Sequence, residues 1–124
     1  MVEACLKRIE VLEPDLQAWA TLDPQGALAT ARRCEQAMRR GEKLGPICGV
    51  PVGLKDIFYT AGLPTSAGSR VYAGFVPEYD ASSVVRLKEA GAIILGKTVT
   101  TEFALSDPAK TANPWNMAHT PGGS

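Results

Sequence analysis

The first residues of the chain alternate apolar and polar side chains at the spacing of an α-helix. Charged residues belong to one face of this helix, and apolar residues to the other, at Val2, Cys5, Leu6, Ile9 and Leu12. The pattern predicts an amphipathic helix that ends near Pro14. No capping residue precedes this helix, so we expect it to begin before the present first residue.

A second helical pattern starts with a capping signal. Asp23 followed by Pro24 is typical of a helix N-cap with proline at the first helical position, and apolar residues then recur at helical spacing up to Gly41. We therefore divide the chain into an N-terminal helical segment, residues 1–44, and a second region, residues 45–124.

The second region begins with short apolar runs separated by Gly, Pro and Ser. Residues 50–54 predict a short buried strand, although Pro51 and Gly53 favour a strand end or a bulge. A loop is expected to follow over residues 56–79.

Another strand is predicted further along the chain. Asp80 is expected to cap a helix of about ten residues that ends before Gly91. Residues 92–95 form a continuous apolar run, which is typical of a strand covered on both faces. Strand, helix and strand in this order predict a parallel pair joined by a right-handed crossover.

Composition and charge exclude several classes of function. The hydrophobic content of 45% is ordinary for a globular protein, and 13 basic against 13 acidic residues leave no net charge. This balance argues against nucleic-acid and membrane-surface binding. Because Glu35 and Glu42 are interspersed with them, a solvated helix face explains the clustered basic residues Arg32, Arg33, Arg39, Arg40 and Lys43.

Cofactors and membrane segments have no support in the sequence. The widely spaced Cys5, Cys34 and Cys48, with the single histidine His119, indicate neither a disulfide framework nor a zinc site. The glycine spacings match no nucleotide-binding loop. No apolar run reaches the ~18 residues of a membrane span, and signal-peptide order is lacking. We expect a cytoplasmic protein without a cofactor.

Five motifs occur in order through the second region. They are GPICGVPVGLKD at 45–56, TAGLPTS at 60–66, GAIILGKT at 91–98, NPWN at 113–116 and TPGGS at 120–124. Together they resemble the N-terminal part of the amidase signature family of hydrolases. The resemblance implies an α/β fold, a mixed sheet sandwiched by helices, of which this chain would supply the N-terminal helices and only the first strands.

The same resemblance assigns catalytic roles to Lys55 and Ser124. Lys55 corresponds to the general base, and Ser124 to the middle serine of a Ser-Ser-Lys triad, which relays the proton and follows a cis peptide bond. The chemistry fits, because the attacking serine must lose a proton while the leaving nitrogen gains one. Apolar surroundings such as Val50, Val52 and Leu54 disfavour a charged amine, so a lysine can act as base without histidine.

The remaining candidates receive lesser roles. Lys97 is the competing lysine, and its expected place after the second strand favours a structural role beside the pocket. Residues 98–103 are candidates for the pocket wall, and His119 is interpreted as a loop residue. The nucleophilic serine and the oxyanion hole of the family have no counterpart in these 124 residues.

We therefore predict the N-terminal part of an amidase that cleaves the carbon–nitrogen bond of a small amide, and that is inactive as an isolated piece. One alternative is the glutamine-hydrolysing component of a tRNA-dependent amidotransferase, which would imply tRNA and a partner subunit. Another is a non-catalytic interaction domain of the same fold. No residue pattern indicates an oligomeric state.

Overall fold

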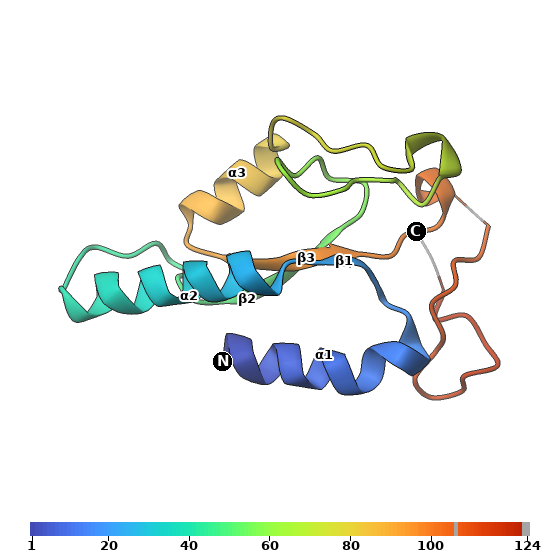
Figure 1. The fold of residues 1–124 in the computed structure, drawn as a ribbon, viewed down its shortest axis with the longest axis horizontal. Helices are drawn as coiled ribbons and strands as arrows, with labels where there is room; N and C mark the ends of the chain where they lie inside the picture. Colours follow the sequence, from blue (N-terminus) through green and yellow to red (C-terminus); the bar gives the residue numbers. More distant parts are fainter. Residues whose placement is uncertain (106, 123–124) are drawn as a thin grey trace.

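The computed structural model describes residues 1–105 and 107–122. Helices lie on both sides of a small sheet, with α1 on one side and α3 on the other (Figure 1). The elements follow one another as α1 (Val2–Leu16), β1 (Trp19–Leu22), α2 (Pro24–Arg39), β2 (Pro51–Lys55), the 3-10 turn η1 (Arg70–Tyr72), α3 (Ser82–Glu89), β3 (Ile93–Thr98) and the 3-10 turn η2 (Glu102–Ala104).

Helix α1 is longer than the sequence predicted, because it continues through Pro14 to Leu16. A proline in the last turn removes only one backbone donor, and the residues after it close the helix in another way. The N–H of Gln17, in the left-handed conformation, donates to the carbonyl of Glu13 at 2.9 Å. The Glu13 carboxylate then accepts the backbone N–H groups of Ala18 and Trp19, at 3.0 and 2.8 Å, and leads the chain into β1.

The predicted cap of α2 is confirmed, whereas that of α3 is wrong. The Asp23 side chain accepts the N–H of Gly26 at 2.9 Å, as an N-cap does. Helix α3 instead follows Ala81 without a side-chain cap. The Asp80 carboxylate is occupied elsewhere, by the backbone N–H of Ala61 at 2.8 Å and by Lys88 Nζ at 2.6 Å.

The described strands form a three-stranded mixed sheet in the order β1-β3-β2. Strand β3 pairs with β2 in parallel, as predicted, and with β1 in antiparallel orientation. The sequence did not predict β1. This strand lies in the segment 1–44 that was expected to be helical, yet it joins a sheet whose other strands come from the second region. The boundary after residue 44 stays a prediction.

Strand β3 also extends beyond the predicted residues 92–95. It ends at Thr98, so Lys97 lies inside the strand and not after it, and its side chain is fully buried. Residues 96–98 pair with β1 on one side and with β2 on the other. This pairing extends the strand beyond its apolar run, so the local sequence pattern did not predict it.

A bulge interrupts the pairing of β2 with β3. Val52 is in register with Ile94, but Gly53 is in register with Gly96, so Leu95 is an extra residue on β3. Gly96 has a φ of +151°, and a Cβ placed there would lie 2.2 Å from the carbonyl oxygen of Thr21 in β1. Only glycine fits this position without a shift of β1.

The hydrophobic core lies between the sheet and the helices α1 and α2. Its fully buried members are Val2, Ala27, Ile93 and Leu95, and the partly buried side chains around them include Cys5, Leu6, Ile9, Trp19, Leu28, Ala31 and Cys34. From α3, Val84 is buried as well. The predicted strand 92–95 therefore does supply the centre of the core.

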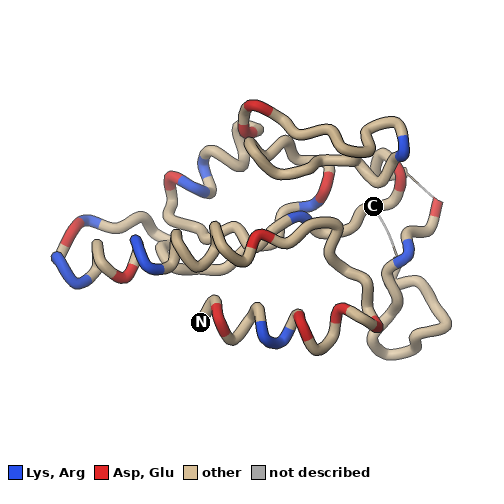
Figure 2. Tube along the Cα trace, in the orientation of Figure 1, with Lys and Arg blue, Asp and Glu red and all other residues tan. Residues whose placement is uncertain are grey.

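The basic cluster of α2 lies on a solvated surface, as predicted. Figure 2 shows both signs of charge interspersed at the end of this helix and the turn after it. Arg39 pairs with Glu35 at 2.6 Å, and both side chains are well exposed. No helix in the described part of the chain has the length and apolar character needed to cross a membrane.

Candidate functional site

The end of β2 carries two charged residues in succession. Lys55 is the last residue of the strand, is half-buried, and is in register with Thr98 of β3. Asp56 follows it and is only 2% exposed. Successive side chains of a strand point to opposite faces of the sheet, so Lys55 and Asp56 belong to opposite faces.

Asp56 forms a buried ion pair with Lys97 of β3. The Lys97 side chain is 0% exposed, and its Nζ lies 3.2 Å from Asp56 Oδ1. This contact is electrostatic, because Oδ1 accepts no well-aligned hydrogen bond. The ammonium donates its hydrogen bonds to the carbonyl of Phe58 at 2.8 Å and to Thr65 Oγ1 at 2.6 Å.

The other carboxylate oxygen of Asp56 binds Ser66. The backbone N–H of Ser66 donates to Oδ2 at 3.0 Å, and the Ser66 hydroxyl donates to the same oxygen at 2.6 Å. The Asp56 backbone is also bonded on both sides, through its N–H to the carbonyl of Thr98 and through its own carbonyl to the N–H of Ala67, each at 2.9 Å. Asp56 thus ties the strand end to the loop that follows.

Burial is the main influence on the charge of Lys97. Removal of the ammonium from water lowers the pKa of Lys97, and the contact with Asp56 raises it again without restoring the ordinary value. Besides each other, both side chains contact further polar groups, Phe58 and Thr65 at Lys97 and Ser66 at Asp56, which offset the cost of burying them.

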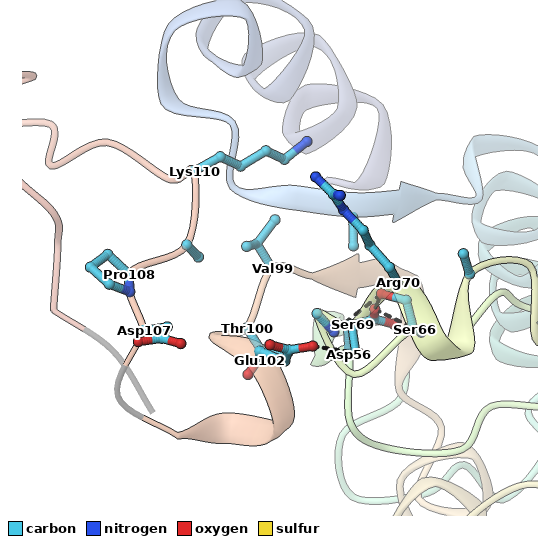
Figure 3. A pocket seen from close by; sticks show the side chains of 14 residues that line it. Asp56, Ser66, Ser69, Arg70, Val99, Thr100, Glu102, Asp107, Pro108 and Lys110 are labelled. Atoms are coloured by element: carbon cyan, nitrogen blue, oxygen red, sulfur yellow. Dashed lines mark hydrogen bonds between the residues drawn. The ribbon is translucent and has the colours of Figure 1, made fainter.

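A cavity of about 520 Å³ opens beside Asp56. Asp56 and Ser66 lie at one side of it, and the side chains of Arg70 and Lys110 extend toward each other across it (Figure 3). Val99, Thr100 and Glu102 complete this part of the wall, so three of the residues 98–103 expected to line a pocket do line this cavity.

A smaller cavity of about 240 Å³ lies near the end of β3. Residues 98–101 form one part of its wall, and Thr120, Pro121 and Gly122 form another. The chain that leads toward Ser124 therefore approaches Thr98, the residue in register with Lys55. Ser124 itself, with the predicted cis bond before it, lies outside the described residues.

The structure does not give the other singled-out residues a chemical role. His119 lies in an exposed turn, as predicted, where its carbonyl accepts the backbone N–H of Asn113 at 2.9 Å. Within residues 1–105 and 107–122, no group of three His, Cys, Asp or Glu side chains could hold a metal ion. The three cysteines are free thiols.

Sequence reasoning overlooked Asp56 and Ser66. One signal was present, since Asp56 directly follows the candidate base at the end of an apolar run. Ser66 gave no such signal, because its bond to Asp56 spans a loop whose course no local pattern predicts.

Comparison with known proteins gives one consistent family. The amidase family model matches residues 1–124. The A subunit of glutamyl-tRNA(Gln) amidotransferase from Chloroflexus aggregans is 44% identical over 130 residues, a match that covers 100% of this chain and 27% of that protein. The chain thus spans about a quarter of the length of the curated relatives it matches.

Solved structures give the same result. Native peptide amidase from Stenotrophomonas maltophilia is 38% identical with a TM-score of 0.90, over 99% of this chain and 28% of that one. The A subunit of glutamyl-tRNA(Gln) amidotransferase from Thermotoga maritima is 28% identical with a TM-score of 0.78, over 99% of this chain and 26% of that one. The ordered motifs, the mixed sheet and these matches show that the chain belongs to the amidase signature family.

Proposed function

We propose that the protein is an amidase that hydrolyses the carbon–nitrogen bond of a small carboxamide, with Lys55 as general base and Ser124 as proton relay. The observation that carries this proposal is the position of Lys55 at the carboxyl end of β2, opposite Thr98. Thr98 shares a cavity with Gly122, two residues before Ser124. The described chain that leads toward Ser124 thus lies near the end of the sheet that carries Lys55, which supports the proposal.

The reaction needs a group that first accepts a proton from the nucleophile and later donates it to the leaving nitrogen. Neutral Lys55 accepts, through the Ser124 hydroxyl, the proton of a nucleophilic serine as that serine attacks the amide carbonyl. The lysine then returns the proton to the leaving nitrogen. We propose that the nucleophile and the oxyanion hole come from sequence outside these 124 residues, because the relatives are about four times as long as the match. We propose a cytoplasmic protein that needs no cofactor.

A second candidate is the glutamine-hydrolysing component of a tRNA-dependent amidotransferase. The relative from Chloroflexus aggregans carries an amidotransferase name and is 44% identical to this chain. The fold of peptide amidase matches with the higher TM-score, 0.90 against 0.78, which favours the first candidate. Ammonia release from glutamine, compared with release from simple amides, distinguishes the two in the full-length protein. A protein that hydrolyses neither would be a non-catalytic interaction domain.

Substitution of Lys55 tests the mechanism. We expect Lys55→Ala in the full-length protein to lower kcat by about 10²- to 10⁴-fold, the usual contribution of a general base. Lys55→Arg should be equally inactive, because guanidinium stays protonated and cannot accept the serine proton. Lys43→Ala, at an exposed lysine, is the control and should leave the rate unchanged. An unchanged rate in Lys55→Arg would remove Lys55 from the mechanism.

A further inference from the structure

The buried ion pair of Lys97 and Asp56 has no counterpart in the proton transfer just described. Lys97 is 0% exposed and Asp56 only 2%. Taking two charges out of water is costly, and an apolar pair of similar volume is often as stable or more stable. Stability alone therefore does not explain why this position holds a charged pair. The pair lies next to Lys55, which suggests a role in the function of that residue.

The bulge in β3 determines which side chain Asp56 meets. Beyond the bulge, Leu54 is in register with Lys97, and Lys55 is in register with Thr98. Side chains in register on parallel strands point to the same face, and the faces alternate along each strand. Asp56 therefore shares a face with Lys97, while Lys55 is directed to the other face. Without the extra residue, the register would bring Lys55 opposite Lys97.

Asp56 is contacted through both its carboxylate and its backbone. Its carboxylate contacts Lys97 and Ser66, and its backbone is bonded to Thr98 and Ala67. Lys97 in turn fixes the loop over Asp56 through Phe58 and Thr65. The N–H of Asp56 belongs to the peptide that joins it to Lys55, and its bond to the carbonyl of Thr98 holds that peptide against β3. The contacts of Asp56 therefore restrict the direction in which the Lys55 side chain points.

The pair also sets the electrostatic surroundings of Lys55. Lys97 and Asp56 carry opposite charges 3.2 Å apart, so together they act on Lys55 as a nearly neutral group. Loss of Lys97 would leave a carboxylate one residue from the base, and a nearby negative charge favours the ammonium form of a lysine.

We propose that Lys97 is a positioning residue for Lys55, acting through Asp56. It orients the base by holding Asp56 in place, and it neutralises the carboxylate that would otherwise keep the base protonated. The proposal rests on the proposed role of Lys55 as general base.

Other charged groups lie near the same strand end. Glu102, Arg70, Asp107 and Lys110 share the 520 Å³ cavity with Asp56. Glu102 accepts a hydrogen bond from Ser69, which holds it in that wall. All of these residues stay unchanged in the variants below, so their effect on Lys55 is common to every measurement.

The test compares Lys97→Met and the double variant Lys97→Met/Asp56→Asn in the full-length protein, with rates measured against pH. A general base acts only when it is unprotonated, so we expect the profile of rate against pH to fall on its acidic side, here called the acidic limb. In Lys97→Met, Asp56 keeps its two hydrogen bonds from Ser66 but loses the ammonium beside it, so the acidic limb should move to higher pH. We expect kcat to fall about 10- to 100-fold with KM within about twofold.

The double variant also removes the carboxylate of Asp56, so the acidic limb should return to its original pH. It also covers the case in which Lys97→Met fails to fold, because an uncharged pair imposes no buried charge. If Lys97→Met does not fold, the double variant alone is measured. An acidic limb at the original pH together with an about 10- to 100-fold lower kcat then supports the positioning role. A matched control is the pair of Lys88 and Asp80, 2.6 Å apart and partly exposed, where Lys88→Met should change neither the acidic limb nor kcat.

Two results would overturn the inference. If Lys97→Met is less heat-stable but keeps the original acidic limb and kcat, the role of Lys97 is purely structural. If the double variant has an unimpaired kcat, Lys97 and Asp56 do not position Lys55. Both differ from failure of the proposed function, in which Lys55→Ala itself would retain activity.

Discussion

Gly96 is the residue at which a single methyl group should disturb both the sheet and the site. Its φ of +151° lies in a region that residues other than glycine rarely adopt, and a Cβ there would be 2.2 Å from the Thr21 carbonyl oxygen. That oxygen belongs to backbone, so it can yield only if β1 moves away from β3. Gly96→Ala should therefore loosen the pairing of β1 with β3 and disturb the bulge that directs Lys97 toward Asp56.

The size of the effect follows from two contributions. A residue in a conformation reserved for glycine costs about 1–3 kcal/mol. Insertion of a methyl group where backbone must shift costs about 1–3 kcal/mol more. The sum is about 2–6 kcal/mol, and since about 1.4 kcal/mol is a factor of ten, local opening should become at least about 30-fold more frequent.

Hydrogen exchange in the full-length protein measures this opening directly. Two amides report on the β1–β3 side of the sheet: the N–H of Asp23, bonded to the Leu95 carbonyl at 2.8 Å, and the N–H of Val99, bonded to the Ala18 carbonyl at 2.9 Å. Both should exchange at least about 30-fold faster in Gly96→Ala, in proportion to the loss of local stability.

Gly62→Ala is the matched control. Gly62 has a φ of +77°, but a Cβ placed there would meet nothing within 4 Å. This substitution should therefore cost only the conformational strain, about 1 kcal/mol, and leave exchange in β1 and β3 unchanged. Exchange in Gly96→Ala within about twofold of the unsubstituted protein would refute the argument that β1 needs glycine at this position.

Two further predictions concern folding. Asp23→Ala removes the acceptor of the Gly26 N–H and should destabilise the protein by about 1 kcal/mol in thermal unfolding, whereas Arg39→Ala, which breaks only an exposed ion pair, should cost under about 0.5 kcal/mol. The isolated 124-residue chain should be inactive and aggregate or pack loosely, because within residues 1–105 and 107–122 the outer strands β1 and β2 each leave one edge unpaired, and Trp115 is 95% exposed. A sharp calorimetric transition of a soluble monomer would contradict this.

Local patterns in the sequence were sufficient for much of the scaffold. The cap at Asp23, the core strand at residues 92–95 and the parallel pairing of β2 with β3 were all predicted and are confirmed. Each depends on residues close together in the chain, such as a short polar side chain before a helix or an apolar run between turns. The ordered motifs also identified the family, because a series of short matches in fixed order rarely arises by chance.

Tertiary structure decided the features that depend on contacts between distant segments. Strand β1 has no strong pattern of its own and forms because β3 offers it partners. The bulge at Leu95 lies where β2 and β3 pair, and it decides that Lys97 meets Asp56. The sequence placed Lys97 after the strand, whereas pairing on both sides extends β3 through it. A buried charge is stable only if partners from elsewhere in the chain satisfy it, and only the folded structure brings those partners together.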